Sequence, residues 1–133
     1  MARAKFFCSI REKGMYNLSK ARRIQKNKEF RLIYRHAKFE VNRFCVVYKM
    51  PVAKEATKVG FVTGKKVGCA VERNRARRLM KEVYRLHQYE IREGYRIVIV
   101  ARAGIEGASY QEVETELMKL LKRAKLLKEA QRE

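Results

Sequence analysis

Apolar side chains recur with the period of an α-helix in three segments of the chain. Residues 27–37 form the first helix and residues 69–87 the strongest one. Ser109 and Glu112 have the spacing of a capping box, which predicts the start of a last helix. The predicted apolar stripes are Phe30, Ile33, Tyr34 and Ala37; Cys69, Ala76, Leu79, Met80, Val83 and His87; and Val113, Leu117, Leu120, Leu121, Ala124 and Leu127.

Three further segments are rich in β-branched and aromatic residues and predict strands. They span residues 39–49, 58–63 and 95–101, and the last is apolar enough to lie in the centre of a sheet. We expect residues 39–63 to form a hairpin with an irregular loop, because Pro51 ends the first strand. The order helix, strand, strand, helix, strand, helix predicts a single-domain α+β sandwich with a small mixed sheet.

The 133 residues suit one domain with short additions at either end. Residues 1–26 are basic with little periodicity, and we interpret them as a flexible N-terminal arm. The folded domain is predicted to span residues 27–128, and residues 129–133 are predicted to form a C-terminal tail.

Charge indicates the kind of partner. The chain has 33 basic and 14 acidic residues, and its net charge is +19. Residues 86–133 contribute only +1, so nearly all of the excess lies in the first 85 residues. Such a charge on a small domain favours a polyanion partner, nucleic acid before an anionic membrane. The sequence has no apolar run long enough to span a bilayer and no signal-peptide pattern, so we expect a cytoplasmic protein without a membrane partner.

The residues that metal and nucleophilic chemistry would need are scarce. All acidic residues are glutamate, so an aspartate-based Mg²⁺ site is excluded. The three cysteines form no C-x-x-C pair, and we expect Cys45 and Cys69 to be buried thiols. His87 lies on an apolar helix face and is interpreted as structural. We therefore predict no catalytic residue, no protein metal site and no small-molecule substrate.

A dense basic segment is the main candidate for binding. It starts with a loop between Gly64 and Gly68 and continues along the helix opposite to its apolar stripe. Cations one helical turn apart can follow a phosphate backbone, and an asparagine among them can contact a base edge or a 2′-hydroxyl. A solvated helix face is the less favoured alternative, because only two glutamates interrupt the cations. The predicted contacts are Lys65, Lys66, Arg73, Asn74, Arg75, Arg77, Arg78, Lys81 and Arg85.

Four aromatic residues form a second candidate site. They lie on the first helix and on the strand that follows it, and such rings suit stacking with unpaired bases. Periodicity by itself favours a core position for all of them. The residues are Phe30, Tyr34, Phe44 and Tyr48.

Residues 65–78 carry the run Lys-Lys-Val-Gly-Cys-Ala-Val-Glu-Arg-Asn-Arg-Ala-Arg-Arg, which strongly resembles the signature of the bacterial ribonuclease P protein subunit. Residues 26–34, 59–62 and 95–102 resemble other parts of that family in order and spacing. The resemblance implies a four-stranded mixed sheet with three helices and a left-handed βαβ crossover, the fold class of the second domain of a small-subunit ribosomal protein. A split of residues 39–49, or a further short strand elsewhere, would supply the fourth strand.

The resemblance also implies a function. In this family the protein partners a catalytic RNA, which removes the 5′ leader of precursor tRNA with its own bound Mg²⁺. The basic helix would then face the catalytic RNA, and the aromatic residues would line the groove that holds the leader. No protein-bound cofactor and no obligate protein partner is implied.

Three other functions remain open at this point. A basic ribosomal or other structural RNA-binding protein would have no role in cleavage. A protein-only nuclease would have to bind metal weakly through glutamates 90, 93, 112 and 116. A DNA-binding module would use residues 69–87 as recognition helix, although a strand, and not a helix, precedes them.

Overall fold

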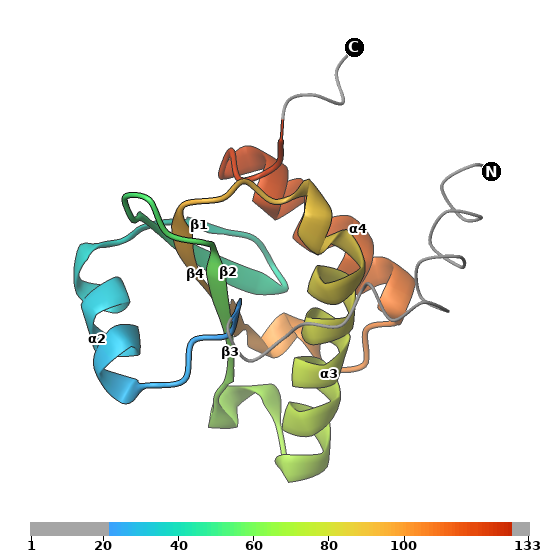
Figure 1. The fold of residues 1–133 in the computed structure, drawn as a ribbon. Coiled ribbons are helices and arrows are strands. Elements are labelled where there is room, and N and C mark those ends of the chain that lie inside the picture. The colour runs from blue at the N-terminus through green and yellow to red at the C-terminus, as the bar shows by residue number, and fades with distance from the viewer. Residues whose placement is uncertain (1–21, 129–133) are drawn as a thin grey trace, which may run out of the picture.

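A computed structural model describes residues 22–128, in which one sheet is covered by helices on both faces. Helix α2 covers one face, and α3 and α4 cover the other (Figure 1). The helices and strands are α2 (Asn27–His36), β1 (Lys38–Val41), β2 (Cys45–Pro51), β3 (Lys58–Thr63), α3 (Ala70–His87), β4 (Tyr95–Ala101) and α4 (Tyr110–Arg123). None of the helices in this part of the chain is long and apolar enough to cross a membrane.

The sheet has the order β1-β2-β4-β3. Strands β1, β2 and β4 are antiparallel neighbours, whereas β3 runs parallel to β4. The split of residues 39–49 into two strands is therefore confirmed, and so are the mixed sheet and the βαβ unit formed by β3, α3 and β4. The α+β fold with three helices in the described residues agrees with the prediction.

The predicted hairpin between residues 39–49 and 58–63 is wrong. The hairpin joins β1 to β2, with Asn42 in its turn, and β4 lies between β2 and β3. Strand β4 is buried at five of its seven positions, and its apolar residues gain most from neighbours on both sides. Burial thus decides the strand order, which local sequence spacing cannot indicate.

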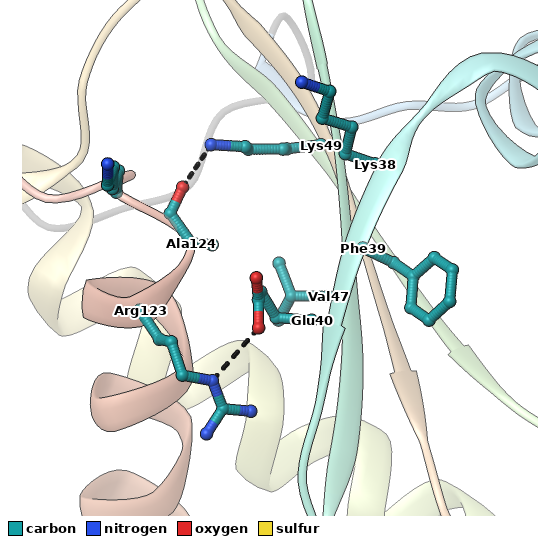
Figure 2. Close-up of a pocket in the computed structure, with 8 residues that line it drawn as sticks. Lys38, Phe39, Glu40, Val47, Lys49, Arg123 and Ala124 are labelled. Carbon is teal, nitrogen blue, oxygen red and sulfur yellow. Dashed lines mark hydrogen bonds and ion pairs between the residues drawn. The ribbon is translucent and has the colours of Figure 1, made fainter.

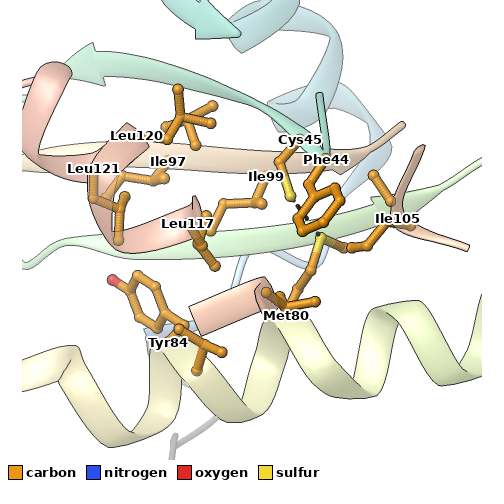
Figure 3. Packing of buried hydrophobic residues seen from close by; sticks show 14 of the residues in the cluster. Phe44, Cys45, Met80, Tyr84, Ile97, Ile99, Ile105, Leu117, Leu120 and Leu121 are labelled. Carbon is orange, nitrogen blue, oxygen red and sulfur yellow. Dashed lines mark hydrogen bonds between the residues drawn. The ribbon is translucent and has the colours of Figure 1, made fainter. Parts of the chain in front are cut away.

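Most of the core lies between the sheet and the helices α3 and α4. Figure 3 shows Cys45 and Ile99 of the sheet facing Met80 of α3 and Leu117 of α4. The predicted stripe of the last helix is buried from Val113 to Ala124, and the Ser109–Glu112 capping box is present. A smaller core under α2 consists of Ile24, Ile33 and Val98 with partly buried neighbours.

The packed domain starts before residue 27, where the sequence boundary was predicted. Ile24 is buried under α2, and its backbone N–H donates to the Val59 carbonyl of β3 at 2.9 Å. Arg22 pairs with Glu93 at 3.0 Å. An apolar side chain at residue 24 therefore fixes a segment that its basic neighbours suggested was an arm. The rest of the predicted arm, and the tail at 129–133, lie outside the described residues.

Candidate nucleic-acid interface

The predicted basic residues gather on α3 and on the 3₁₀ turn Lys65–Val67 that precedes it. Arg77 links this helix to the sheet, because its guanidinium donates to Thr63 Oγ1 at 3.1 Å and to Asn74 Oδ1 at 3.3 Å. Thr63 ends β3, which is an edge strand of the sheet. The basic surface therefore extends from α3 to the end of β3.

Some of the predicted contacts also hold the fold together. Arg73 donates to the Gly68 carbonyl at 3.1 Å, and Arg75 donates to the Ala108 carbonyl at 2.6 Å. Arg85 forms an ion pair with Glu82 one turn away. These three arginines stand partly buried along α3. Some of the N–H groups of these guanidinium groups therefore bond within the protein, and only the others can bond to RNA.

Other cations of this surface point to solvent. Lys65, Lys66 and Arg78 are exposed and make no side-chain hydrogen bond or ion pair within residues 22–128. Lys81 is half-buried on the same helix. Exposed cations without internal partners can bind phosphate groups without breaking any hydrogen bond or ion pair of the fold.

The second candidate site is a cluster of rings between α2 and the hairpin of β1 and β2. Tyr34 of α2 meets Tyr48 of β2 edge-on, with ring centroids 5.1 Å apart. The Phe39 ring of β1 also contacts Tyr48, with ring centroids 5.7 Å apart. We call Tyr34, Phe39 and Tyr48 the ring cluster. Phe39 is 61% exposed and Tyr34 41%, so both offer ring surface to a ligand.

Phe39 was not among the predicted site residues. It pairs with Tyr48 in the register of β1 and β2, so the two side chains stand on the same face of the sheet. The missed signal was the turn at Asn42, which makes residues 38–41 a separate strand whose alternation can be aligned with that of β2. Without that pairing, nothing in the sequence distinguished Phe39 from the other apolar residues of the predicted strand.

Phe30 lies deeper than the ring cluster and is partly buried against the small core. It packs over Gly60 of β3 so closely that a Cβ on this glycine would be 2.6 Å from the ring. The glycine therefore leaves the space in which the ring rests on the sheet. Strand β3 contacts both candidate surfaces, since Gly60 meets Phe30 and Thr63 meets Arg77.

The placement of Phe44 in the leader groove is wrong. Its side chain is 5% exposed and belongs to the large core, on the face of the sheet opposite to the ring cluster. The Asn42 side chain accepts the backbone N–H groups of Phe44 and Cys45, which makes this segment a turn and not a strand. Alternation counted back from Tyr48 fails there, so the ring enters the core beside Met80 (Figure 3).

The two described cysteines differ. Cys45 is buried in the large core with its Sγ 3.7 Å from Met80 Sδ, and burial raises the pKa of its thiol to about 12. The expected burial of Cys69 is wrong, because this residue is the exposed N-cap of α3. The apolar stripe of the helix begins at Ala76, further along the helix.

An ion-pair network fixes α2 on the sheet. Arg96 of β4 is buried, and its Nε donates to Glu29 Oε2 in the first turn of α2 at 3.1 Å. The same guanidinium donates to the Ala56 carbonyl at 3.0 Å and pairs with Glu55. Sequence reasoning had no reason to single out one arginine in a basic chain. Its position in the most apolar strand was the available signal.

The described residues offer few side-chain arrangements suited to metal binding or acid–base catalysis. No group of three or more His, Cys or Glu side chains within residues 22–128 is arranged to hold a metal ion. Both ring nitrogens of His87 face carboxylates, with Glu90 at 2.8 Å and Glu114 at 2.7 Å. The ring joins α3 to α4 inside the fold. Burial, and then the neighbouring Tyr48, raise the pKa of Tyr34, so its ring stays neutral.

The fold and the two surfaces define a small basic α+β protein with a cationic helix face and an exposed ring cluster, a combination typical of nucleic-acid-binding proteins. The family model for ribonuclease P matches residues 18–125. The chain is 38% identical over 108 residues to the ribonuclease P protein component of Alkaliphilus oremlandii, and the match covers 81% of this chain and 95% of the relative. It is 41% identical over 106 residues to that of Clostridium botulinum, covering 79% and 96%.

A solved structure agrees with these relatives. The ribonuclease P protein of Staphylococcus aureus superposes with a TM-score of 0.75 at 31% identity, covering 82% of this chain and 100% of that protein. The chain belongs to the ribonuclease P protein family. Its function is that of a protein subunit of ribonuclease P in the processing of tRNA 5′ ends.

Proposed function

We propose that the chain binds two parts of the ribonuclease P reaction complex on two surfaces. The ring cluster, with Phe30 beneath it, holds the single-stranded 5′ leader of precursor tRNA. The basic surface of α3 binds the catalytic RNA. The observation that carries the proposal is the pair of exposed rings, Phe39 and Tyr34, at 5.7 Å and 5.1 Å from Tyr48. Exposed rings on a basic protein suit stacking with unpaired bases, which a mature 5′ end does not provide.

Cleavage itself is assigned to the RNA partner. The chain lacks aspartate, and its described glutamates and histidines form no cluster that fits a Mg²⁺ ion. We infer that Mg²⁺ acts through the RNA subunit and that the protein contributes binding and orientation. An assay of precursor-tRNA cleavage at low Mg²⁺, with and without a bacterial ribonuclease P RNA, tests this assignment. Stimulation that depends on the RNA supports it, and cleavage by the protein alone overturns it.

Removal of the exposed rings tests the leader surface. A chain with Phe39→Ala and Tyr34→Ala loses two stacking partners, each worth about 1–3 kcal/mol per base. We expect holoenzyme affinity for precursor tRNA to fall by about tenfold or more, while affinity for mature tRNA stays unchanged. Leu32→Ala is the control, because Leu32 is exposed on α2 outside the ring cluster. Equal loss for precursor and mature tRNA would contradict a leader-specific surface.

Salt dependence tests the basic surface of α3. Arg78 is exposed without an internal partner in the described chain, so Arg78→Ala removes one cation and leaves the fold intact. We expect the slope of log affinity against log salt, for the protein with the ribonuclease P RNA, to decrease by about 0.7–0.9 for each phosphate that is no longer neutralised. Lys119→Ala on the exposed side of α4 removes the same charge elsewhere and should leave the slope unchanged. An identical decrease in both variants would indicate a general charge effect.

A further inference from the structure

A basic pocket lies on the face of the sheet opposite to the ring cluster. It is formed by β1, β2 and the C-terminal end of α4, and its volume is about 210 Å³ (Figure 2). It lies apart from the basic surface of α3 and shares only Phe39 with the ring cluster. The pocket is lined by Lys38, Phe39, Glu40, Val47, Lys49, Arg123, Ala124 and Lys125.

Positive charge dominates this pocket. Four of its residues are cations, and its one carboxylate, Glu40, is already paired with Arg123 at 3.1 Å. Lys38 and Lys125 are exposed and have no side-chain partner within residues 22–128. At least two ammonium groups at this site therefore have no countercharge in the described protein.

The C-terminal carbonyls of α4 do not balance these charges. Lys49 donates to the Ala124 carbonyl at this helix end, as cations near a helix C-terminus often do. Burial nevertheless lowers the pKa of Lys49, and repulsion from Lys38 and Lys125 lowers it further. One cation would be enough to stabilise the C-terminal carbonyls of α4. The additional cations beside it repel one another, so neutralising the helix end does not explain their number.

The turn after α4 has a lysine at a backbone conformation that glycine would adopt more easily. Lys125 has φ +62°, the left-handed conformation in which glycine is the common residue after a helix. A lysine there carries a steric cost that glycine would avoid. Lys125 lines the same pocket as Lys38 and Lys49.

Strand β1 connects the pocket to the ring cluster. Side chains of a strand alternate between the two faces, so Phe39 points to the ring cluster while Glu40 points to α4 (Figure 2). Lys38 stands beside Phe39 on the edge of the sheet. A strand of RNA stacked on Phe39 needs only to pass this edge to bring a phosphate to the cations.

We propose that the pocket of Lys38, Lys49 and Lys125 binds an RNA phosphate, and that this phosphate belongs to the part of the precursor leader that extends past the ring cluster. The proposal rests on the assignment of the ring cluster to the leader. The same phosphate chemistry could come from the catalytic RNA, so the two sources need separate measurements.

The variant Lys125→Gly separates binding from folding. Glycine suits the left-handed position, so urea unfolding should show a stability equal to or above that of the parent chain. In the reconstituted holoenzyme, we expect affinity for a precursor tRNA with a long leader to fall by about fivefold, with a salt slope smaller by about 0.7. A precursor whose leader ends within the ring cluster, and mature tRNA, should bind as before. Lys38→Ala should behave in the same way.

Lys119→Ala is the matched control, because it removes one exposed lysine of α4 outside the pocket. An unchanged long-leader affinity in Lys125→Gly, or an equal loss for short and long leaders, would overturn the proposal. A loss seen instead in binding of the protein to ribonuclease P RNA would move the phosphate to the catalytic RNA and overturn the leader assignment. Tyr34 belongs to the ring cluster and does not line the pocket, so unchanged leader discrimination in Tyr34→Ala would overturn the leader surface without testing the pocket, and the two failures are distinguishable.

Discussion

Arg96 is the side chain whose removal should most directly uncouple α2 from the sheet. Its side chain is 8% exposed, and its guanidinium bonds to Glu29 of α2, the Ala56 carbonyl and Glu55. Arg96→Met keeps the length and apolar contacts of the side chain and removes all three interactions. The first turn of α2 then keeps an acidic group with no cation bonded to it.

The expected cost follows from burial. A hydrogen bond to a charged group contributes about 1.5–3 kcal/mol, and breaking a buried ion pair costs about 3–5 kcal/mol. Glu29 and Glu55 keep 30% and 58% of their side-chain surface exposed, so water recovers part of the loss. We expect Arg96→Met to lower the free energy of unfolding by about 2–4 kcal/mol in equilibrium urea denaturation. The holoenzyme should also bind precursor tRNA less tightly, because α2 carries Tyr34.

Arg22→Met provides a control with a similar ion-pair distance but a different burial. Arg22 pairs with Glu93 at 3.0 Å, and the two side chains are 45% and 54% exposed. Its removal should cost less than about 1 kcal/mol. A double variant, Arg96→Met with Glu29→Gln, should lose less than the sum of its single changes. Equal losses for Arg96→Met and Arg22→Met would refute the reasoning, since burial would then not determine the strength of the pair.

Two further predictions concern the core. A Cβ at Gly104 would lie 2.5 Å from the backbone oxygen of Arg43, so Gly104→Ala should destabilise the fold by about 1–3 kcal/mol in urea denaturation. A Cβ at Gly64 would meet nothing within 4 Å, so Gly64→Ala should leave the stability unchanged, and similar values for both variants would contradict the steric argument. In a chain lacking Cys8, a thiol reagent at about pH 8 should modify Cys69 at once and Cys45 only on unfolding. Cys69 is exposed, whereas burial raises the pKa of the Cys45 thiol to about 12. Rapid reaction of both thiols in the native protein would contradict the buried position of Cys45.

The sequence by itself determined the helices and most of their buried stripes, and its charge indicated a polyanion as the kind of partner. Helical periodicity and the Ser109–Glu112 box placed α4, and the predicted stripe of α3 is buried from Ala76 onward except at Leu79, which is partly buried. These features are local, since a helical period of about 3.6 residues and a cap depend on neighbours a few positions away. The charge of +19 and the missing aspartates likewise need no coordinates.

Only the tertiary structure decided which side chains lie in the core and which lie on the surface. Phe44 and Phe39 have the same chemistry, yet the Asn42 turn places one in the core and the other on the surface. The position of β4 between β2 and β3, and the meeting of Lys38 with Lys125, likewise join residues far apart in the chain. Periodicity reports the face of each element separately. Only the packing of the elements against one another determines which faces are covered and which remain open to RNA.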